Sequence, residues 1–440
     1  MNDLTARFDV IVKYVAAIRL LKNNRLEWDD LTKNLYEEHI NIMTSGTFRE
    51  ESGNKKSLTD YMSSYADLIH DFKNENFNPL DKIPVDKNGN PWDGAHRIAS
   101  ALIFKKELDF ERIDTNSEVD YGYSFFLQNK YKYLSYVVDN FLQLNRNYRL
   151  ALVWPSNEHQ ELIVNKLPSK KILFEVDWND NCAHQAVALA YFGEEWLGDP
   201  ETNFRGAWDK VYECFKTKKT LKIIIFDPEE RNLVAFKNQL REVGKNGKHS
   251  IHITDSYEET HEKSLLFLGS EFDIWSRFCK INLNTSFIKK INTFKQYCKK
   301  NALDFNQIKI RGGTVLDLLS LRKSDDIDVI YYEDYKSNDF LYDFSKPDDL
   351  NALNKNYFLY HGLKFETFSS LYNSKKNSSD LKSKKDFELL QNINTQLGLY
   401  DSIRNRYDFE FLKFKRRFLN LLKDLKIYDL IRKIYRIIVR

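Results

Sequence analysis

The chain has 440 residues, 42% of them hydrophobic and 30% charged, a balance that excludes a disordered or fibrous protein. This length exceeds what one hydrophobic core usually supports, so two or three domains are expected. Gly and Pro number only 15 and 8, which argues against a loop-rich or repeated-turn architecture. Apolar runs stay shorter than a membrane span requires, so no transmembrane helix is expected.

The formal net charge of +3 conceals an asymmetry along the chain. Residues 411–440 hold ten Lys and Arg against two Asp, a local charge of +8, which leaves −5 for the remaining 410 residues. A mildly acidic body with one basic end favours a single localised electrostatic contact, and no nucleic-acid partner is expected. The four cysteines lie far apart, and no apolar signal block follows the first Met, so we expect a cytoplasmic protein without zinc or disulfides.

The pattern along the chain predicts a mixed α/β fold in several domains. Apolar residues at helical spacing predict helices over residues 1–50, and a polar loop then leads to a helix that Ser57 caps. A short strand at 83–86 and a turn at 87–90 precede a helix that begins near Ala95. We place the first domain at 1–145.

The middle segment alternates buried strands with helical patterns, which predicts an α/β domain at 146–270. Asp255, together with Glu258, Glu259 and His261, could line a cleft. We instead favour Asp255 as a helix N-cap, with the other three residues in a solvated first turn. The expected elements are strands at 149–154, 171–176, 221–226 and 249–253, and helices at 183–192, 229–243 and 257–268.

A third domain is expected at 271–400, with a helix at 285–299, a segment Ile308–Gly313 and a strand at 327–332. Residues 373–386 are rich in Lys, Ser, Asn and Asp, a composition that predicts a solvated loop.

The first motif with chemical content is the segment Asp93-Gly94-Ala95-His96-Arg97. It follows a strand and a turn and opens a helix, whose free N–H groups favour an anion. Arg97 adds a bidentate phosphate donor. The alternative is a helix start at which His96 and Arg97 only cap and pair locally.

Residues 55–115, and this segment in particular, resemble the ParB/sulfiredoxin-like superfamily, in which a Gly-x-His-Arg loop binds nucleotide phosphates. The resemblance implies phosphate or donor binding by Asp93, Gly94, His96 and Arg97. Sulfiredoxin-like members place a catalytic Cys before the His-Arg pair, but this chain has Ala95 there, so that chemistry is excluded.

The second motif begins at Arg311-Gly312-Gly313-Thr314, where a helix opens, and continues to Asp326-Ile327-Asp328 on an apolar strand. Residues two apart on a strand point to the same face, so the two carboxylates lie side by side. Adjacent carboxylates repel unless a cation separates them, and a hard divalent ion such as Mg²⁺ or Mn²⁺ suits this set. The alternative is a surface acid cluster that ends a strand.

This pattern resembles the nucleotidyltransferase superfamily typified by DNA polymerase beta, and its LicD/fukutin branch, which transfers phosphorylated groups from CDP-activated donors. The resemblance implies that Asp326 and Asp328 are catalytic metal ligands and that residues 311–314, Arg311, Gly312, Gly313 and Thr314, bind the donor phosphates. A third catalytic carboxylate is expected on a later strand. Glu366, which alternates with apolar neighbours, is the candidate by position.

The C-terminal residues 401–440 are predicted to form a basic amphipathic helix, with apolar stripes over 411–438 and Lys or Arg on the other faces. Such a helix suits an anionic membrane surface, each basic residue contributing about 1 kcal/mol. The alternative is a helix docked on the acidic body.

Together the motifs resemble proteins of bacterial capsule, O-antigen and lipopolysaccharide gene clusters that join a ParB-like to a nucleotidyltransferase-like domain. We therefore expect a peripheral membrane transferase that uses Mg²⁺ or Mn²⁺, a pyrophosphate-containing donor (nucleotide sugar, CDP-alditol or phosphoribosyl pyrophosphate) and a glycan or lipid-linked glycan acceptor. The alternatives are a nucleotidyltransferase that releases pyrophosphate and a non-catalytic ParB-like nucleotide-binding module.

Overall fold

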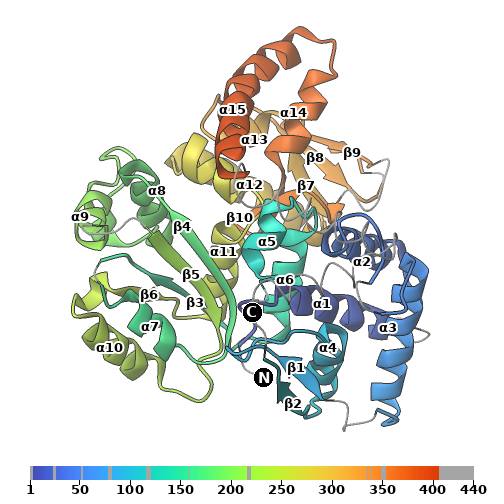
Figure 1. The fold of residues 1–440 in the computed structure, drawn as a ribbon. Coiled ribbons are helices and arrows are strands. Elements are labelled where there is room, and N and C mark those ends of the chain that lie inside the picture. Colours follow the sequence, from blue (N-terminus) through green and yellow to red (C-terminus); the bar gives the residue numbers. More distant parts are fainter. Residues whose placement is uncertain are drawn as a thin grey trace.

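The computed structural model describes residues 3–22, 26–50, 53–77, 82–114, 120–156, 158–215, 220–333, 335–337, 339–347 and 353–405. These residues form a mixed α/β structure with three sheets, as the sequence predicts. Three lobes follow one another along the chain (Figure 1).

The first lobe contains a small β-α-β unit packed among helices. Strands β1 and β2 are parallel, with Ile83 opposite Phe110, and α4 connects them. The predicted cap at Ser57 is confirmed: its side chain accepts from Asp60 N–H, and Asp60 accepts from Ser57 N–H in return. The elements are α1 (Phe8–Lys22), α2 (Asp30–Met43), α3 (Leu58–Lys73), β1 (Ile83–Val85), α4 (Ala95–Phe104), β2 (Phe110–Arg112), α5 (Tyr123–Gln128) and α6 (Leu134–Leu144).

The second lobe is built on an antiparallel sheet of order β4-β5-β3-β6. All four predicted strands are present. The helix predicted from 229 begins later, because Asn232 caps it by accepting from Ala235 N–H at 3.1 Å. The elements are β3 (Arg149–Val153), α7 (Gln160–Lys166), β4 (Lys170–Asp177), α8 (Asp180–Ala190), η1 (Glu195–Leu197), α9 (Arg205–Cys214), β5 (Thr220–Phe226), α10 (Leu233–Gly244), η2 (Gly247–His249), β6 (Ile251–Ile253) and α11 (Tyr257–Phe267).

The third lobe contains a mixed sheet of order β10-β11-β7-β8-β9. Strand β7 pairs antiparallel with β8 and parallel with β11, although 51 residues separate the ends of β7 and the start of β11 in the chain. The elements are η3 (Ile274–Phe278), α12 (Thr285–Lys300), η4 (Phe305–Gln307), β7 (Ile308–Arg311), α13 (Gly313–Leu318), β8 (Ile327–Tyr331), β9 (Tyr342–Ser345), β10 (Tyr357–Tyr360), β11 (Leu363–Glu366), α14 (Phe368–Lys376) and α15 (Leu381–Asn405).

One hydrophobic cluster joins the three lobes, from Leu4 in the first to Ile393 in the third. Helix α5 packs on β4 through Tyr123 and Phe174, whose ring centroids lie 5.2 Å apart, and α6 contacts both α1 and α11. A smaller cluster lies between the other face of the middle sheet and helices α7 and α10. The predicted boundaries at 145/146 and 270/271 fall between elements, but the lobes share this core.

The predicted loop at 373–386 is wrong: most of it belongs to the end of α14 and the start of α15. Asp380 accepts from Ser383 N–H at 2.8 Å and so caps α15. The buried Asp386 carboxylate receives two hydrogen bonds from Arg322, at 2.6 and 2.8 Å, and pairs with Lys375 at 3.0 Å. These contacts hold a polar segment in helical form.

The basic C-terminal segment that the sequence predicts as an amphipathic helix lies, from residue 406, outside the described residues. Its contact with a membrane surface stays a prediction. Among the described helices, none is both long and apolar enough to cross a membrane.

Candidate functional site

A row of charged side chains crosses four strands of the third lobe. Arg311 at the end of β7 lies opposite Asp328 of β8, and Asp328 lies opposite Asp343 of β9. On the other side, Phe365 of β11 lies opposite Ile310, which places Glu366 next to Arg311. Cross-strand partners share a face of the sheet, so three carboxylates and one guanidinium lie on one face.

Glycine at position 312 is required at the centre of this row. Its φ of +66° lies in the left-handed region, and a Cβ there would sit 2.3 Å from Asp328 Oδ2. The bare backbone can therefore approach both neighbouring carboxylates. Gly312 N–H donates to Glu366 Oε2 and Gly313 N–H donates to Asp328 Oδ2, both at 3.4 Å.

The two aspartates of the Asp-x-Asp pair have different environments. The pKa of Asp328 lies above its ordinary value because the carboxyl is partly buried and Asp326 and Asp343 are close to it. For Asp326, burial raises the pKa, but a hydrogen bond from Ser324 Oγ at 2.9 Å and a nearby lysine outweigh it, so its pKa is lowered. At Asp328, burial and the neighbouring carboxylates therefore outweigh the Gly313 hydrogen bond and the Arg311 charge, so the site disfavours the ionised carboxylate.

The Asp326 main chain is fixed by the preceding helix. Thr314 is fully buried, and its hydroxyl donates to Asp326 O at 2.9 Å. This hydroxyl supports the start of β8, and the phosphate contact of Thr314 stays a prediction.

Glu366, which the sequence indicates only by its position, lies in this row of charged side chains. Its carboxylate oxygens accept hydrogen bonds from neighbouring groups of the protein. Its Oε1 accepts from Ser370 Oγ at 2.6 Å, and the residue is buried. In the described part of the chain, no three His, Cys, Asp or Glu side chains are grouped closely enough to hold a metal ion. Asp326 and Asp328 fit a divalent cation by donor chemistry, since two close carboxylates favour one. Glu366 forms no three-ligand group with them.

The His-Arg segment of the first lobe lies at the start of α4, as predicted. Gly94, with φ of +78°, is the N-cap, and a Cβ there would meet Ile83 at 2.5 Å. The Arg97 guanidinium folds back beside Gly94, so it lies close to the backbone N–H groups of the first turn of α4. Together with the exposed Asp93, these residues stay candidates for an anion site.

His96 occupies a different environment from the one the motif predicts. Its Nε2 is 2.8 Å from the Tyr36 hydroxyl, and its ring packs edge-on against Tyr65 with centroids 4.5 Å apart. Burial, and then the nearby Lys13 ammonium, hold the pKa of His96 well below its ordinary value. The ring is therefore neutral at neutral pH. It is half-buried and held against α2 and α3 by Tyr36 and Tyr65, and its contact with a phosphate stays a prediction.

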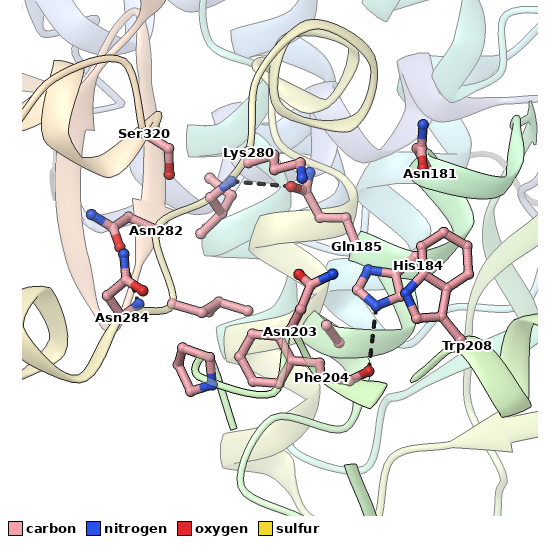
Figure 2. A pocket seen from close by; sticks show the side chains of 14 residues that line it. Asn181, His184, Gln185, Asn203, Phe204, Trp208, Lys280, Asn282, Asn284 and Ser320 are labelled. Carbon is pink, nitrogen blue, oxygen red and sulfur yellow. Dashed lines mark hydrogen bonds between the residues drawn. The ribbon is translucent and has the colours of Figure 1, made fainter. Parts of the chain in front are cut away.

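A pocket of about 180 Å³ at the junction of the second and third lobes was missed by sequence reasoning. Figure 2 shows Asn282, Asn284 and Ser320 on one side of it and His184, Asn203 and Trp208 on the other. The His184 and Trp208 rings lie 4.3 Å apart, and His184 donates to Phe204 O at 3.3 Å. The lining segments are far apart in the chain, so no local pattern could have indicated this pocket.

This junction pocket touches the helix that follows the Gly-Gly turn. Asn282 donates to both Asp317 O and Asp317 Oδ1 of α13 at 3.0 Å, which ties one wall of the pocket to that helix. The lining is rich in amides and has one lysine, Lys280, and no carboxylate. Amides beside ring faces suit a neutral, polar ligand.

Comparison of the chain with protein-family models, with curated proteins and with solved structures gives no match.

Proposed function

We propose that the protein is a metal-dependent transferase that uses a pyrophosphate-containing donor in bacterial surface-polysaccharide assembly. The observation that carries the proposal is the row on the third-lobe sheet, where Asp328 and Asp326 lie beside the Gly312-Gly313 turn and Arg311. Paired carboxylates beside a close-approaching backbone and a guanidinium suit a divalent ion bridged to phosphate oxygens.

Each group in the row would have a separate task. Asp326 and Asp328 would hold Mg²⁺ or Mn²⁺, which supplies charge neutralisation for the donor phosphates. Arg311 is exposed in the same row and would pair with a phosphate oxygen. Glu366, hydrogen-bonded to Gly312 N–H and Ser370, would position the Gly-Gly backbone. Such a site acts by orientation and electrostatics.

The junction pocket supports a sugar acceptor. Its amides and its two adjacent rings can bind hydroxyl groups and the apolar face of a sugar, and its lining lacks carboxylates that would compete for the metal. A glycan or lipid-linked glycan acceptor is therefore consistent with the position of this pocket beside α13.

The donor class can be tested by a thermal-shift screen of nucleotide sugars, CDP-alditols and phosphoribosyl pyrophosphate, with and without Mg²⁺. A donor that binds only the folded state raises stability by about 2.7 kcal/mol at a hundredfold excess over its dissociation constant. Release of pyrophosphate from a nucleoside triphosphate would favour the nucleotidyltransferase alternative. Nucleotide binding with no consumption under any metal condition would favour the binding-module alternative.

The metal can be tested without knowing the substrate. Titration of Mn²⁺, followed by electron paramagnetic resonance, should show binding that weakens at least about tenfold in Asp326→Asn and in Asp328→Asn. The matched control is Asp325→Asn, because Asp325 is an exposed neighbour in the same turn and should leave affinity unchanged. Equal Mn²⁺ binding by all four proteins, wild type included, would remove the metal from the proposal.

A further inference from the structure

A second pocket, which the proposed function does not use, lies in the second lobe, between α9, α10 and β6. Its volume is about 500 Å³. Helices α9 and α10 lie at the left of Figure 1, away from β7 and β8. The pocket is therefore separate from the carboxylate row of the third lobe.

Its floor carries cations that lack acidic partners. Lys210 of α9 is 6% exposed, and its ammonium group donates to Lys248 O at 2.8 Å and lies 5.0 Å from the Tyr191 ring centroid. Among the described residues, no carboxylate is within ion-pairing distance of Lys210 or Arg241. Burial is the main cause that lowers the pKa of Lys210; the nearby Cys214 thiol acts to raise it, and the cations Lys248 and Arg241 lower it further.

Arg241 of α10 provides an independent sign of a missing ligand. Its Nε is buried and has no hydrogen-bond partner within the described chain, while its Nη1 donates to Asn238 Oδ1 at 3.3 Å. Buried polar groups are almost always paired, so an unpaired guanidinium N–H beside a second buried cation calls for an anionic partner.

The acidic groups of the pocket do not supply that partner. Glu194, Asp209 and Asp255 are exposed at its rim, and Glu213 is half-buried. Lys237, the second buried lysine of the lining, forms an ion pair with Asp255. Its charge is therefore already balanced within the pocket. The floor is therefore cationic, although the whole lining contains both signs.

Aromatic side chains stand beside these cations. Tyr191 packs against Trp196 with ring centroids 5.1 Å apart, and the Trp196 side chain is 46% exposed. An exposed ring at the mouth of a pocket can stack on a sugar or a base, whereas an inorganic ion would leave it unused.

We propose that this second-lobe pocket binds the phosphate group of a small phosphorylated sugar or nucleotide. Arg241 receives the phosphate with its unpaired N–H, Lys210 supplies a buried positive charge, and Trp196 covers the organic part of the ligand. The site requires no divalent metal and does not depend on the transferase proposal.

Isothermal titration in the presence of EDTA tests the site with pyrophosphate, ribose 5-phosphate and UMP, against ribose and uridine as phosphate-free controls. At least one phosphorylated probe should bind, and neither control should. Lys210→Met and Arg241→Met should each weaken that binding at least about tenfold, the loss expected for one charge-assisted contact. Lys166→Met, on the exposed side of the neighbouring α7, is the matched control and should bind like the wild type.

Two further results keep the test decisive. Lys210→Met should melt at or above the wild-type temperature, because it removes a buried cation that lacks a carboxylate partner. Asp328→Asn should bind the probes like the wild type, which separates this pocket from the metal row. Absence of binding by all three phosphorylated probes, or unchanged binding in both Lys210→Met and Arg241→Met, would overturn the proposal.

Discussion

The buried carboxyl of Glu271, next to the candidate site, predicts a specific pH dependence of stability. Its Oε2 accepts from Phe368 N–H at 2.7 Å at the start of α14, and the residue is 5% exposed. Burial first, and then the nearby Asp273 and Glu366 carboxylates, raise its pKa from 4.5 to about 7 against this hydrogen bond. The folded state therefore holds the Glu271 proton more tightly than the unfolded chain does.

The sign follows from proton linkage. Between pH 4.5 and about 7 the unfolded chain has released this proton and the folded protein has not, so stability falls as pH rises. Below this range the group contributes nothing. Above it, the charged and buried carboxylate costs about 3 kcal/mol, because a tenfold change in proton affinity is worth about 1.4 kcal/mol.

Glu271→Gln should therefore become more stable relative to the wild type as pH rises, by up to about 3 kcal/mol between pH 5 and 8. The measurement is urea unfolding of both proteins at several pH values. The difference between the two proteins is the informative quantity, because buried histidines such as His39, whose pKa is lowered well below its ordinary value by burial, act on both equally. Any pH-independent effect of the glutamine amide adds the same amount to this difference in unfolding free energy at every pH.

The matched control is Glu242→Gln, since Glu242 is an exposed carboxylate on α10. Its difference from the wild type should stay within about 0.5 kcal/mol at every pH. A Glu271→Gln difference that is independent of pH would refute the reasoning, because it would show that Glu271 ionises as readily in the folded protein as in the unfolded chain.

Three further outcomes are expected. Asp386→Asn should destabilise the protein by about 3 kcal/mol in urea unfolding, because it leaves Arg322 without its carboxylate partner; a loss below about 1 kcal/mol would show that this pair does not anchor α15. Gly312→Ala should destabilise by about 1–2 kcal/mol from the left-handed φ alone, and should also lower Mn²⁺ affinity through the clash with Asp328; an unchanged protein would contradict the close approach. Arg97→Ala should weaken a ligand of the His-Arg loop by about 1.5–3 kcal/mol in calorimetry, and unchanged affinity for every phosphate ligand found in the screen would leave the loop a structural role.

Features that depend on short stretches of chain could be predicted from the sequence. The sequence predicts a helix that opens at Gly312-Gly313, and α13 begins there. It also predicts a strand after the Asp-x-Asp pair, and β8 runs from Ile327 with Asp328 in it and Asp326 just before it. Ser57 is predicted as a cap from its position before the next helical pattern, and the structure shows that it forms a capping box with Asp60. Two strands of the second lobe, β3 and β5, could be predicted because each is a largely apolar run.

Features that depend on which segments meet were decided by the tertiary structure. The position of Glu366 beside Arg311 requires β11 to pair with β7, and nothing local sets that pairing. The contacts of the His96 ring with Tyr36 and Tyr65 likewise depend on helices that the local motif does not specify. Residues 373–386 are polar in composition, but most of them are helical. The hydrogen bonds that Arg322 donates to Asp386, which is distant in the chain, help to hold them in this form.

The two pockets show most clearly the difference between what local sequence indicates and what only the tertiary structure decides. Each is lined by segments that are far apart in the chain. Lys210 and Arg241 look like ordinary surface residues in the sequence, but α9 and α10 bring them into one pocket, where Lys210 is buried and Arg241 is half-buried. Local patterns report the preferences of neighbouring residues, which short-range hydrogen bonds and side-chain periodicity determine. Burial of charge and the order of strands depend on the free energy of the whole packed chain, and this is why only the tertiary structure could decide them.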